Sequence, residues 1–342
     1  MTDQNFTYSD LLSQAIGAND LSRPQAYWAF TQIMAGQWTP AQIGAMLTAL
    51  SAKGETVDEI TAAAQAMRDH SVKIDTGGLD VIDTCGTGGT GLKTFNISTA
   101  AAMVLAGAGA KVAKHGNRTN TRSSGSADVL ETLGVNLDAS SAAVEQSLRQ
   151  AGVCFCYARL CHPAMKHAGP VRRELGVRTI FNVLGPLTNP AGAKRQLMGV
   201  FSDELTEPIA NVLANLGAER VMVVHAADGL DEISTTSETR ISQFDGGVVT
   251  TMTIKPEDFG IQRAAMSDLL ADSPEASAET IRSVLSGQSG PARDIVLLNA
   301  AAGLFVAGTS DDMQSGLEAA KVSIDSGAAA DALDKLIKVS SE

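Results

Sequence analysis

The sequence predicts an α/β protein: a small N-terminal helical domain plus a larger α/β domain with a central, mostly parallel sheet. Two observations carry this prediction. Between residues 8 and about 73, apolar residues such as Ile43, Met46 and Leu47 recur at helical spacing, and strands have no obvious place there. From Asp80 on, short β-branched runs alternate with alanine-rich ones, which indicates strand–helix–strand units around a parallel sheet.

Helix starts and strand-like runs define the expected elements. Thr39 precedes Pro40, and Thr56 stands three residues before Glu59, so both threonines are expected to begin helices. The alternating region predicts strands at 81–83, 111–114, 153–157, 196–201 and 220–224. Helices are expected between them at 97–107, 127–133, 142–151 and 204–216. A β-rich stretch near 240–254 and a helical C-terminal third complete the chain.

Turn-forming residues between 170 and 194 interrupt this alternation, as at Gly185-Pro186 and Asn189-Pro190. We interpret the segment from about 170 to 194 as chain that returns to the helical domain. That domain would comprise residues 1–75 and this segment, and residues 76–342 would form the α/β domain. Several crossings would then join the two domains, and a cleft between them is the expected ligand site.

Charge and cysteine usage narrow the class of protein. The net charge of -12 argues against a partner that is nucleic acid or an anionic membrane, because both require clustered positive charge. The sequence contains neither a membrane-spanning apolar run nor a secretory signal, so we expect a cytoplasmic protein. Cys154, Cys156 and Cys161 cluster without zinc-ribbon spacing. On a strand, the first two would share one face as small apolar residues.

A glycine-rich loop follows the first expected strand. Four glycines lie between Cys85 and Thr94, and the segment Asn96-Ile-Ser-Thr99 begins the next helix. The loop has neither the ending of a P-loop nor the acidic residue of a dinucleotide-binding fold. Glycine allows backbone N–H groups to line an anion-binding concavity, and a helix start adds free donors. A glycine turn alone is more often structural, but together with the helix start it favours a phosphate ligand.

A second polar loop, Lys114 to Arg118, follows the next strand, with Arg122 and Ser126 close behind. The plain alternative is a solvated surface loop. Residues 125–131 are expected to begin another helix and to add further N–H donors. Two helix starts and Lys114 suit a ligand with two separated phosphate groups better than a single phosphate.

Two acids and an arginine complete the candidate site. Asp231 and Glu232 follow the strand at 220–224 and are expected at the same sheet edge as the glycine loop. Adjacent acids on a loop are usually solvated, but a phosphate-rich site needs Mg²⁺, which binds carboxylates. Arg172 follows Pro170, a residue suited to the first position of a helix. It can bind a carboxylate through two N–H groups; the alternative is an exposed first-turn arginine.

These motifs together resemble the anthranilate phosphoribosyltransferase family along nearly the whole chain. The strongest segments are 86–89 with 94–99, 114–118, 125–131, 162–166 and 178–190. The resemblance implies transfer of the phosphoribosyl group of phosphoribosyl pyrophosphate to the amine of anthranilate, the second step from chorismate to L-tryptophan. It also implies two Mg²⁺ ions per subunit and a homodimer formed through the helical domain.

The resemblance implies roles for individual residues. Ser98, Asp231 and Glu232 would bind Mg²⁺, and Gly86, Asn117 and Arg172 would contact anthranilate. His115 is a candidate proton acceptor, although a neutral aromatic amine requires no strong base; its alternative role is a loop hydrogen bond. The implied phosphoribosyl pyrophosphate-binding residues are Gly86, Gly89, Thr90, Thr94, Asn96, Ile97, Ser98, Thr99, Lys114, His115, Gly116, Asn117, Arg118, Thr119, Asn120, Thr121, Arg122 and Ser126.

The chain departs from the family pattern at two places. Thr90 stands where the family usually has Asp, and residues 119–123 read Thr-Asn-Thr-Arg-Ser where the family usually has Ala-Val-Ser-Ser-Lys. The loss of a carboxylate and the cation gained at Arg122 should change substrate and metal affinity. Three alternatives stay open: a transferase with a changed aromatic acceptor, a pyrimidine nucleoside phosphorylase, and a non-catalytic nucleic-acid-binding relative.

Overall fold

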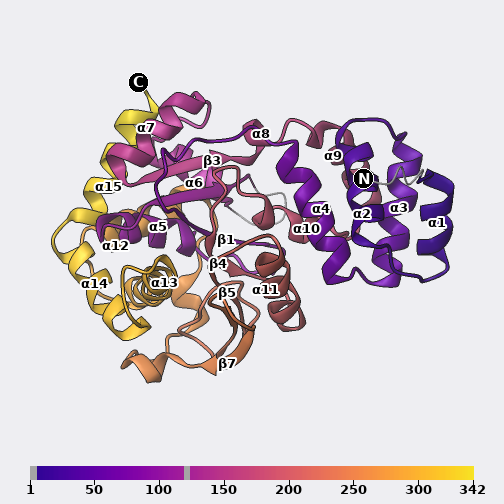
Figure 1. Cartoon of the computed structure of the whole chain (residues 1–342). Coiled ribbons are helices and arrows are strands. Elements are labelled where there is room, and N and C mark those ends of the chain that lie inside the picture. Colours follow the sequence, from indigo (N-terminus) through magenta and orange to yellow (C-terminus); the bar gives the residue numbers. More distant parts are fainter. Residues whose placement is uncertain (1–5, 119–123) are drawn as a thin grey trace. The chain divides into compact units, whose positions relative to one another are not determined.

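The computed structural model describes residues 6–118 and 124–342, and its chain divides into two units (Figure 1). The helical unit comprises Met1–Lys73 and Arg159–Pro190, and the sheet unit comprises Ile74–Ala158 and Ala191–Glu342. The predicted fold class is confirmed, because one unit is helical and the other carries a mostly parallel sheet. The segment that belongs with the N-terminal helices is 159–190, whereas the sequence placed it at about 170–194.

Capping residues set the starts of two helices in the helical unit. Thr39 and Thr56 each accept a hydrogen bond from the backbone N–H three residues on, and Gln42 and Glu59 complete the two capping boxes. Both helices begin where the sequence predicted. The elements of this unit are α1 (Tyr8–Ile16), α2 (Arg23–Met34), α3 (Pro40–Lys53), α4 (Val57–Asp69), α8 (Ala158–Cys161, at the unit boundary), α9 (Met165–Leu175), α10 (Phe181–Leu184) and the 3₁₀ turn η1 (Pro186–Thr188).

Pro170 lies inside α9, so its predicted place at the first position of a helix is wrong. The helix begins earlier because the N–H groups of Met165 and His167 already bond to the carbonyls three residues before them. Proline has no N–H, so Pro170 leaves one bond out of this helix. As a consequence, Arg172 lies in the last turn of α9 and not in its first.

Seven strands form one sheet in the order β3-β2-β1-β4-β5-β6-β7. The five predicted strands are present and pair in parallel: β1 (Ile82–Gly86), β2 (Val112–Gly116), β3 (Val153–Tyr157), β4 (Arg195–Gly199) and β5 (Arg220–Ala226). The β-rich stretch forms β6 (Thr239–Phe244) and β7 (Thr250–Ile254), which are antiparallel. Strand order reverses between β1 and β4, and open α/β sheets bind ligands at the carboxyl ends of the strands at such a reversal.

Helices cover the sheet on both sides, with α13 and α11 drawn on opposite sides of it in Figure 1. Both α5 and α13 are buried along most of their length, which their nearly all-round apolar sequences require. The helix predicted at 97–107 coincides with α5. The remaining elements of the sheet unit are α5 (Ile97–Gly107), α6 (Ser126–Leu133), α7 (Ser141–Ala151), η2 (Asp203–Leu205), α11 (Thr206–Asn215), η3 (Pro256–Phe259), η4 (Met266–Leu269), α12 (Pro274–Leu285), α13 (Pro291–Ala307), α14 (Met313–Asp325) and α15 (Ala328–Ser340).

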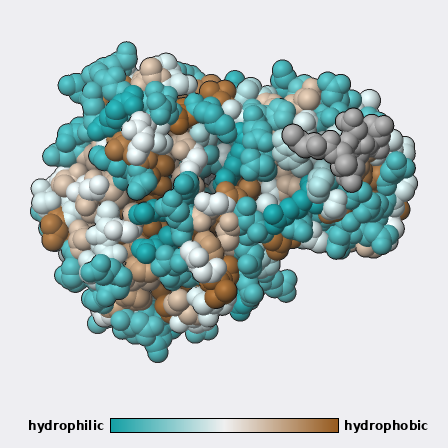
Figure 2. Space-filling model, viewed as in Figure 1, coloured by the Kyte–Doolittle hydropathy of each residue, from teal (hydrophilic) through white to brown (hydrophobic). Residues whose placement is uncertain are grey.

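Hydrophobic residues on the face shown in Figure 2 are scattered in small groups among hydrophilic ones. The described residues include no helix with both the length and the apolar character that a membrane span needs.

Candidate functional site

Two loops and the start of a helix meet at the carboxyl edge of the parallel strands in the sheet unit. The acidic loop after β5 contacts the glycine loop after β1, because Gly88 donates its N–H to Asp231 Oδ2 at 2.8 Å. It also contacts the start of α5, where Ser98 donates its N–H to Glu232 Oε1 at 3.3 Å. The structure therefore brings together the two acids and the anion-binding loop that the sequence predicted at one sheet edge.

The glycine loop depends on glycine in two ways. Gly88, Gly89 and Gly91 adopt φ values of 66°, 77° and 75°, in the left-handed region that other residues avoid. Gly86 has no such φ, but a Cβ there would collide with the Asp231 carboxylate. Gly199, at the end of β4, was not among the predicted site residues, yet a Cβ there would collide with the Asp231 carbonyl. The sequence feature that could have indicated Gly199 is a glycine at the end of a strand, which often marks a close approach of another backbone.

Lys114 supplies a buried positive charge at the start of α5. Its side chain, on β2, donates from Nζ to the Thr84 carbonyl and to Ser98 Oγ at 3.2 Å. Burial lowers the pKa of Lys114, while the nearby carboxylates of Asp83 and Glu232 act in the opposite direction. The Lys114 cation and the Glu232 carboxylate thus both bond to Ser98.

The chain from Thr94 through the first turn of α5 is mostly buried. Thr94 forms an isolated bridge with Leu270, and Ile97 is 1% exposed. Thr99 is fully buried, so its hydroxyl does not reach the surface of the site. Thr90 accepts a hydrogen bond from the N–H of Leu92 at 3.4 Å. Asn96 is only partly buried, and its side chain bonds to Ser124 and Ser277.

The second polar loop is held against α6. The Asn117 carbonyl accepts hydrogen bonds from the Ala127 N–H at 3.2 Å and from Ser126 Oγ at 3.4 Å. A Cβ at Gly116 would collide with Ser126. His115 is buried, and its backbone N–H donates to Asp83 Oδ1 at 3.0 Å. Adjacent strand positions face opposite sides of a sheet, so Lys114 and His115 point away from each other.

Arg118 is directed toward acids on α6. Its guanidinium bonds to Asp128 at 2.8 Å and to both oxygens of Glu131 at 2.9 Å, and these partners raise its pKa. This pairing places the Arg118 charge on α6 and not on the glycine loop. The other predicted residues of this loop, Thr119, Asn120, Thr121 and Arg122, lie outside the described residues.

Arg172 belongs to the helical unit. Its guanidinium carbon lies 5.3 Å from the centre of the Phe181 ring, a cation–π contact, and burial lowers its pKa. Nearby in the chain, His162 is buried. Burial and the charge of Lys73 lower the pKa of His162 to about 4, against a hydrogen bond with the Thr188 backbone.

Metal-ligating side chains do not gather into larger clusters in the described part of the chain. Among residues 6–118 and 124–342, no group of three or more His, Cys, Asp or Glu side chains could hold a metal ion. Cys154 and Cys156 are fully buried in β3, in agreement with their interpretation as small apolar residues.

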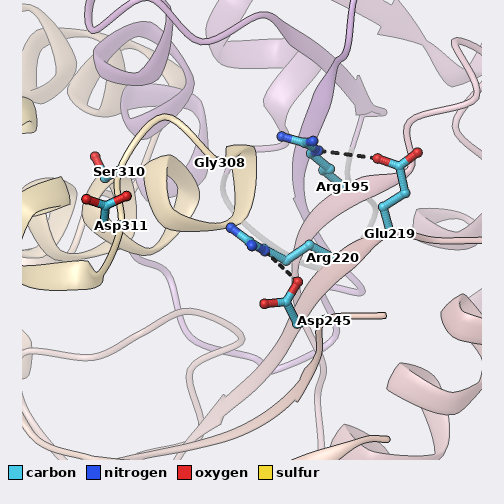
Figure 3. Close-up of a pocket in the computed structure, with 7 residues that line it drawn as sticks. All are labelled: Arg195, Glu219, Arg220, Asp245, Gly308, Ser310 and Asp311. Carbon is cyan, nitrogen blue, oxygen red and sulfur yellow. Dashed lines mark hydrogen bonds and ion pairs between the residues drawn. The ribbon is translucent and has the colours of Figure 1, made fainter. Parts of the chain in front are cut away.

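A pocket of about 350 Å³ opens at the opposite edge of the sheet, at the first residues of β4 and β5 (Figure 3). Arg220 donates to the Phe305 carbonyl at 2.9 Å and pairs with Asp245. Arg195 donates to the Ala307 carbonyl and pairs with Glu219. Both arginines thus bind the last carbonyls of α13, a stabilising position for cations. We assign them a structural role and place the functional site at the other edge.

Comparison with protein families fits this two-unit arrangement. Residues 78–330 match the model described as the α/β domain of a glycosyl transferase family, and residues 9–71 match the helical bundle domain of a glycosyl transferase family. The fold and the site therefore define a two-domain glycosyl transferase.

Individual relatives narrow the class further. The chain is 52% identical to anthranilate phosphoribosyltransferase of Rhodospirillum rubrum, over 99% of this chain and 98% of that one. It is 54% identical to the Thioalkalivibrio sulfidiphilus enzyme of that name, over 93% and 94%. The crystal structure of the Thermus thermophilus enzyme superposes with a TM-score of 0.92 at 40% identity, covering 97% of this chain and 100% of that one. The chain belongs to the anthranilate phosphoribosyltransferase family.

This membership confirms the resemblance found in the sequence and the prediction of a transferase enzyme. The names of these relatives support neither a nucleoside phosphorylase nor a nucleic-acid-binding protein.

Proposed function

We propose that this chain transfers the phosphoribosyl group of phosphoribosyl pyrophosphate to the amine of anthranilate. The products would be N-(5-phospho-β-D-ribosyl)anthranilate and pyrophosphate, in the second step from chorismate to L-tryptophan. The observation that supports this proposal best is that Lys114 and Glu232 of the acidic loop both bond to Ser98, at the start of α5. Saccharomyces cerevisiae anthranilate phosphoribosyltransferase, 29% identical with a TM-score of 0.88 over 98% of this chain and 99% of that one, has been solved with phosphoribosyl pyrophosphate and Mg. A structure of the yeast enzyme with 4-fluoroanthranilate supports the acceptor.

The donor is proposed to bind at the carboxyl edge of β1 and β2. The N–H groups of the glycine loop and of the start of α5 would donate to phosphate oxygens, as is usual at such positions. Lys114 would add positive charge where the pyrophosphate leaves. A buried cation close to the developing negative charge lowers the barrier more than an exposed one, because water screens it less.

The residues at Ser98, Asp231 and Glu232 fit Mg²⁺, which prefers oxygen ligands and binds through a few carboxylates plus substrate phosphates. We propose that these three side chains serve two ions per subunit. When bound, Mg²⁺ neutralises charge that develops on the departing pyrophosphate. Gly88 and Ser98 now donate their N–H groups to Asp231 and Glu232. A phosphate oxygen that accepts from the same N–H groups would therefore release the two carboxylates for the metal.

The proposed reaction requires no strong base. The amine lone pair of anthranilate forms the bond to ribose C1, and the bond from C1 to the pyrophosphate oxygen breaks with its electron pair. Attack opposite to the leaving group inverts C1. The amine then loses one proton, and His115 stays a predicted acceptor for it. Holding both reactants in line is expected to supply much of the acceleration.

Arg172 is proposed to bind the carboxylate of anthranilate. Its side chain is half-buried and its guanidinium packs on Phe181, so its orientation is restricted before the acceptor arrives. A preorganised arginine loses less conformational entropy when it forms a bidentate bond.

The test is the loss of anthranilate fluorescence on mixing with phosphoribosyl pyrophosphate and Mg²⁺. We expect consumption of anthranilate with Mg²⁺ and none in EDTA. A Lys114→Met variant should lose turnover, whereas Arg195→Met, which alters the pocket at the opposite edge, should keep it if it folds. Unchanged fluorescence with the wild-type chain and Mg²⁺ would refute the proposal.

Assembly and location follow from the family resemblance. We propose a homodimer formed through the helical domain and a cytoplasmic location. Light scattering after size-exclusion chromatography tests the first, and a monomeric mass would contradict it.

A further inference from the structure

Asn96 stands at the N-cap of α5 but does not cap that helix. Asparagine is among the preferred N-cap residues because its side chain can accept from the first free N–H groups of a helix. Here the Asn96 side chain makes no such bond, and Glu232 accepts from Ser98 instead. The amide of Asn96 is therefore committed to other partners.

Those partners are two serines from distant parts of the sheet unit. Ser277 Oγ donates to Asn96 Oδ1 at 2.7 Å and accepts from the Asn96 backbone N–H at 2.9 Å. Ser124 Oγ donates to the same Oδ1 at 2.8 Å, and Asn96 Nδ2 donates to the Ser124 carbonyl at 3.2 Å. Asn96 thus links the start of α5 to Ser124, just before α6, and to α12.

Ser277 is fully buried on α12, beside the equally buried Ala278 and Ile281. A buried hydroxyl costs free energy unless it is hydrogen-bonded. Its bonds to the side chain and backbone of Asn96 meet this requirement. These bonds to Asn96 explain how a serine can be buried at position 277.

The two hydroxyl protons on Oδ1 fix the orientation of the Asn96 amide, because only the oxygen can accept both. Nδ2 then lies on the other side of the amide. Among the described residues, one of its two N–H groups donates to the Ser124 carbonyl. The remaining N–H is a donor suited to a phosphate oxygen. A flipped amide would present its oxygen there, and two acceptors facing each other repel.

We propose that Ser277 is a positioning residue for the phosphoribosyl pyrophosphate site, acting by holding the Asn96 amide with its N–H toward the donor. This inference rests on the proposed function. Ser277 lies beneath the site on another helix and is not itself a catalytic residue.

The test compares Ser277→Ala with Ser323→Ala. Ser323 is likewise buried and donates to α5, but at the Val104 carbonyl near the other end of that helix. We expect Ser277→Ala to raise the donor KM about tenfold, the worth of one hydrogen bond, with the anthranilate KM and kcat changed less than about twofold. Ser323→Ala should leave all three constants near wild type. Ser277→Thr, which keeps the hydroxyl, should restore the donor KM.

A second background separates positioning from general destabilisation. In Asn96→Ala protein, Ser277→Ala should cause no further rise in the donor KM, because the residue through which it acts is gone. Binding of phosphoribosyl pyrophosphate with Mg²⁺ by calorimetry, without anthranilate, should show the same pattern.

Equal donor KM values for wild type and Ser277→Ala would overturn the inference. The same rise in donor KM when Ser277→Ala is added to Asn96→Ala would also overturn it. Should Ser277→Ala fail to fold, Ser277→Cys, a poorer donor of similar size, takes its place, and an unchanged donor KM there also overturns it. A wild-type chain that binds no phosphoribosyl pyrophosphate would instead refute the proposed function.

Discussion

Glu232 and Ser98, separated by 134 positions in the chain, are joined by a 3.3 Å hydrogen bond from the Ser98 N–H to Glu232 Oε1. The carboxylate thus occupies the place of an N-cap side chain at α5 and carries negative charge where the helix dipole favours it. The backbone just after Glu232 is fixed in turn, because the buried Asn299 amide bonds both the N–H and the carbonyl of Ile233, at 2.9 and 2.8 Å.

Glu232→Ala should separate these two roles. Loss of the cap is expected to lower the free energy of unfolding by about 1 kcal/mol, and loss of the proposed metal ligand to reduce turnover at least about a hundredfold. Chemical denaturation and the fluorescence assay measure the two effects. Glu238→Ala removes an exposed acid a few residues on and should change neither; near-normal turnover of Glu232→Ala would contradict its assignment.

Gly199→Ala should impair turnover although Gly199 was absent from the sequence-predicted site. A Cβ there would collide with the backbone of Asp231, so the acidic loop must shift, and displacement of a reacting group by about 1 Å can cost about a hundredfold in rate. Gly247→Ala is the matched control, because a Cβ at Gly247 meets no atom within 4 Å. Equal turnover of the two variants would show that the close approach has no functional consequence.

Arg172→Ala should weaken use of anthranilate specifically. Loss of a hydrogen bond to a charged group costs about 1.5–3 kcal/mol, so we expect the anthranilate KM to rise at least about tenfold with the donor KM nearly unchanged. Arg173→Ala, the exposed neighbour on α9, controls for loss of positive charge. Steady-state kinetics with each substrate varied in turn will measure both KM values. An unchanged anthranilate KM would exclude the proposed contact between Arg172 and the anthranilate carboxylate.

Glu59 should be important for the stability of the helical unit. It is fully buried and bonds to Lys53 at 2.9 Å and to the N–H groups of Leu21 and Thr56, each at 2.8 Å. Breaking a buried ion pair from one side costs about 3–5 kcal/mol, and we expect Glu59→Ala to lose that much in denaturant unfolding. Asp58→Ala, which breaks an exposed pair with Arg23, should lose about 1 kcal/mol or less.

The pH dependence of stability should include a contribution from His162. The folded chain lowers its pKa from 6.5 to about 4, so between these values the unfolded chain binds more protons. The contribution is fully present above pH 6.5 and is lost as pH falls toward about 4. Because one pKa unit is worth about 1.4 kcal/mol, the total is about 3 kcal/mol. His162→Gln should show a shallower loss of unfolding free energy between pH 6.5 and 4 than wild type; identical slopes would refute this.

Local sequence patterns determined most of the elements. The helix at 97–107 was predicted at its observed bounds because its sequence is an alanine-rich apolar run, which is typical of a buried helix. The strand β3 was predicted because Val153–Tyr157 has helical stretches on both sides. Threonine caps marked the starts of α3 and α4. Pro170 was misplaced because the preference of proline for a first helical turn is a tendency, and the hydrogen bonds that begin α9 at Met165 are not visible in composition.

The sequence by itself determined the fold class, the glycine loop, the nearness of Asp231 and Glu232 to it, and the family, because each depends on residue types at short spacing or on the order of strands. Only the tertiary structure decided which atoms meet. The contact of Gly199 with Asp231, the cap from Glu232 to Ser98, the pairing of Arg118 with α6 and the hold of Ser277 on Asn96 join residues 10 to 181 positions apart. Such contacts follow from packing of the whole sheet unit, which no local pattern encodes.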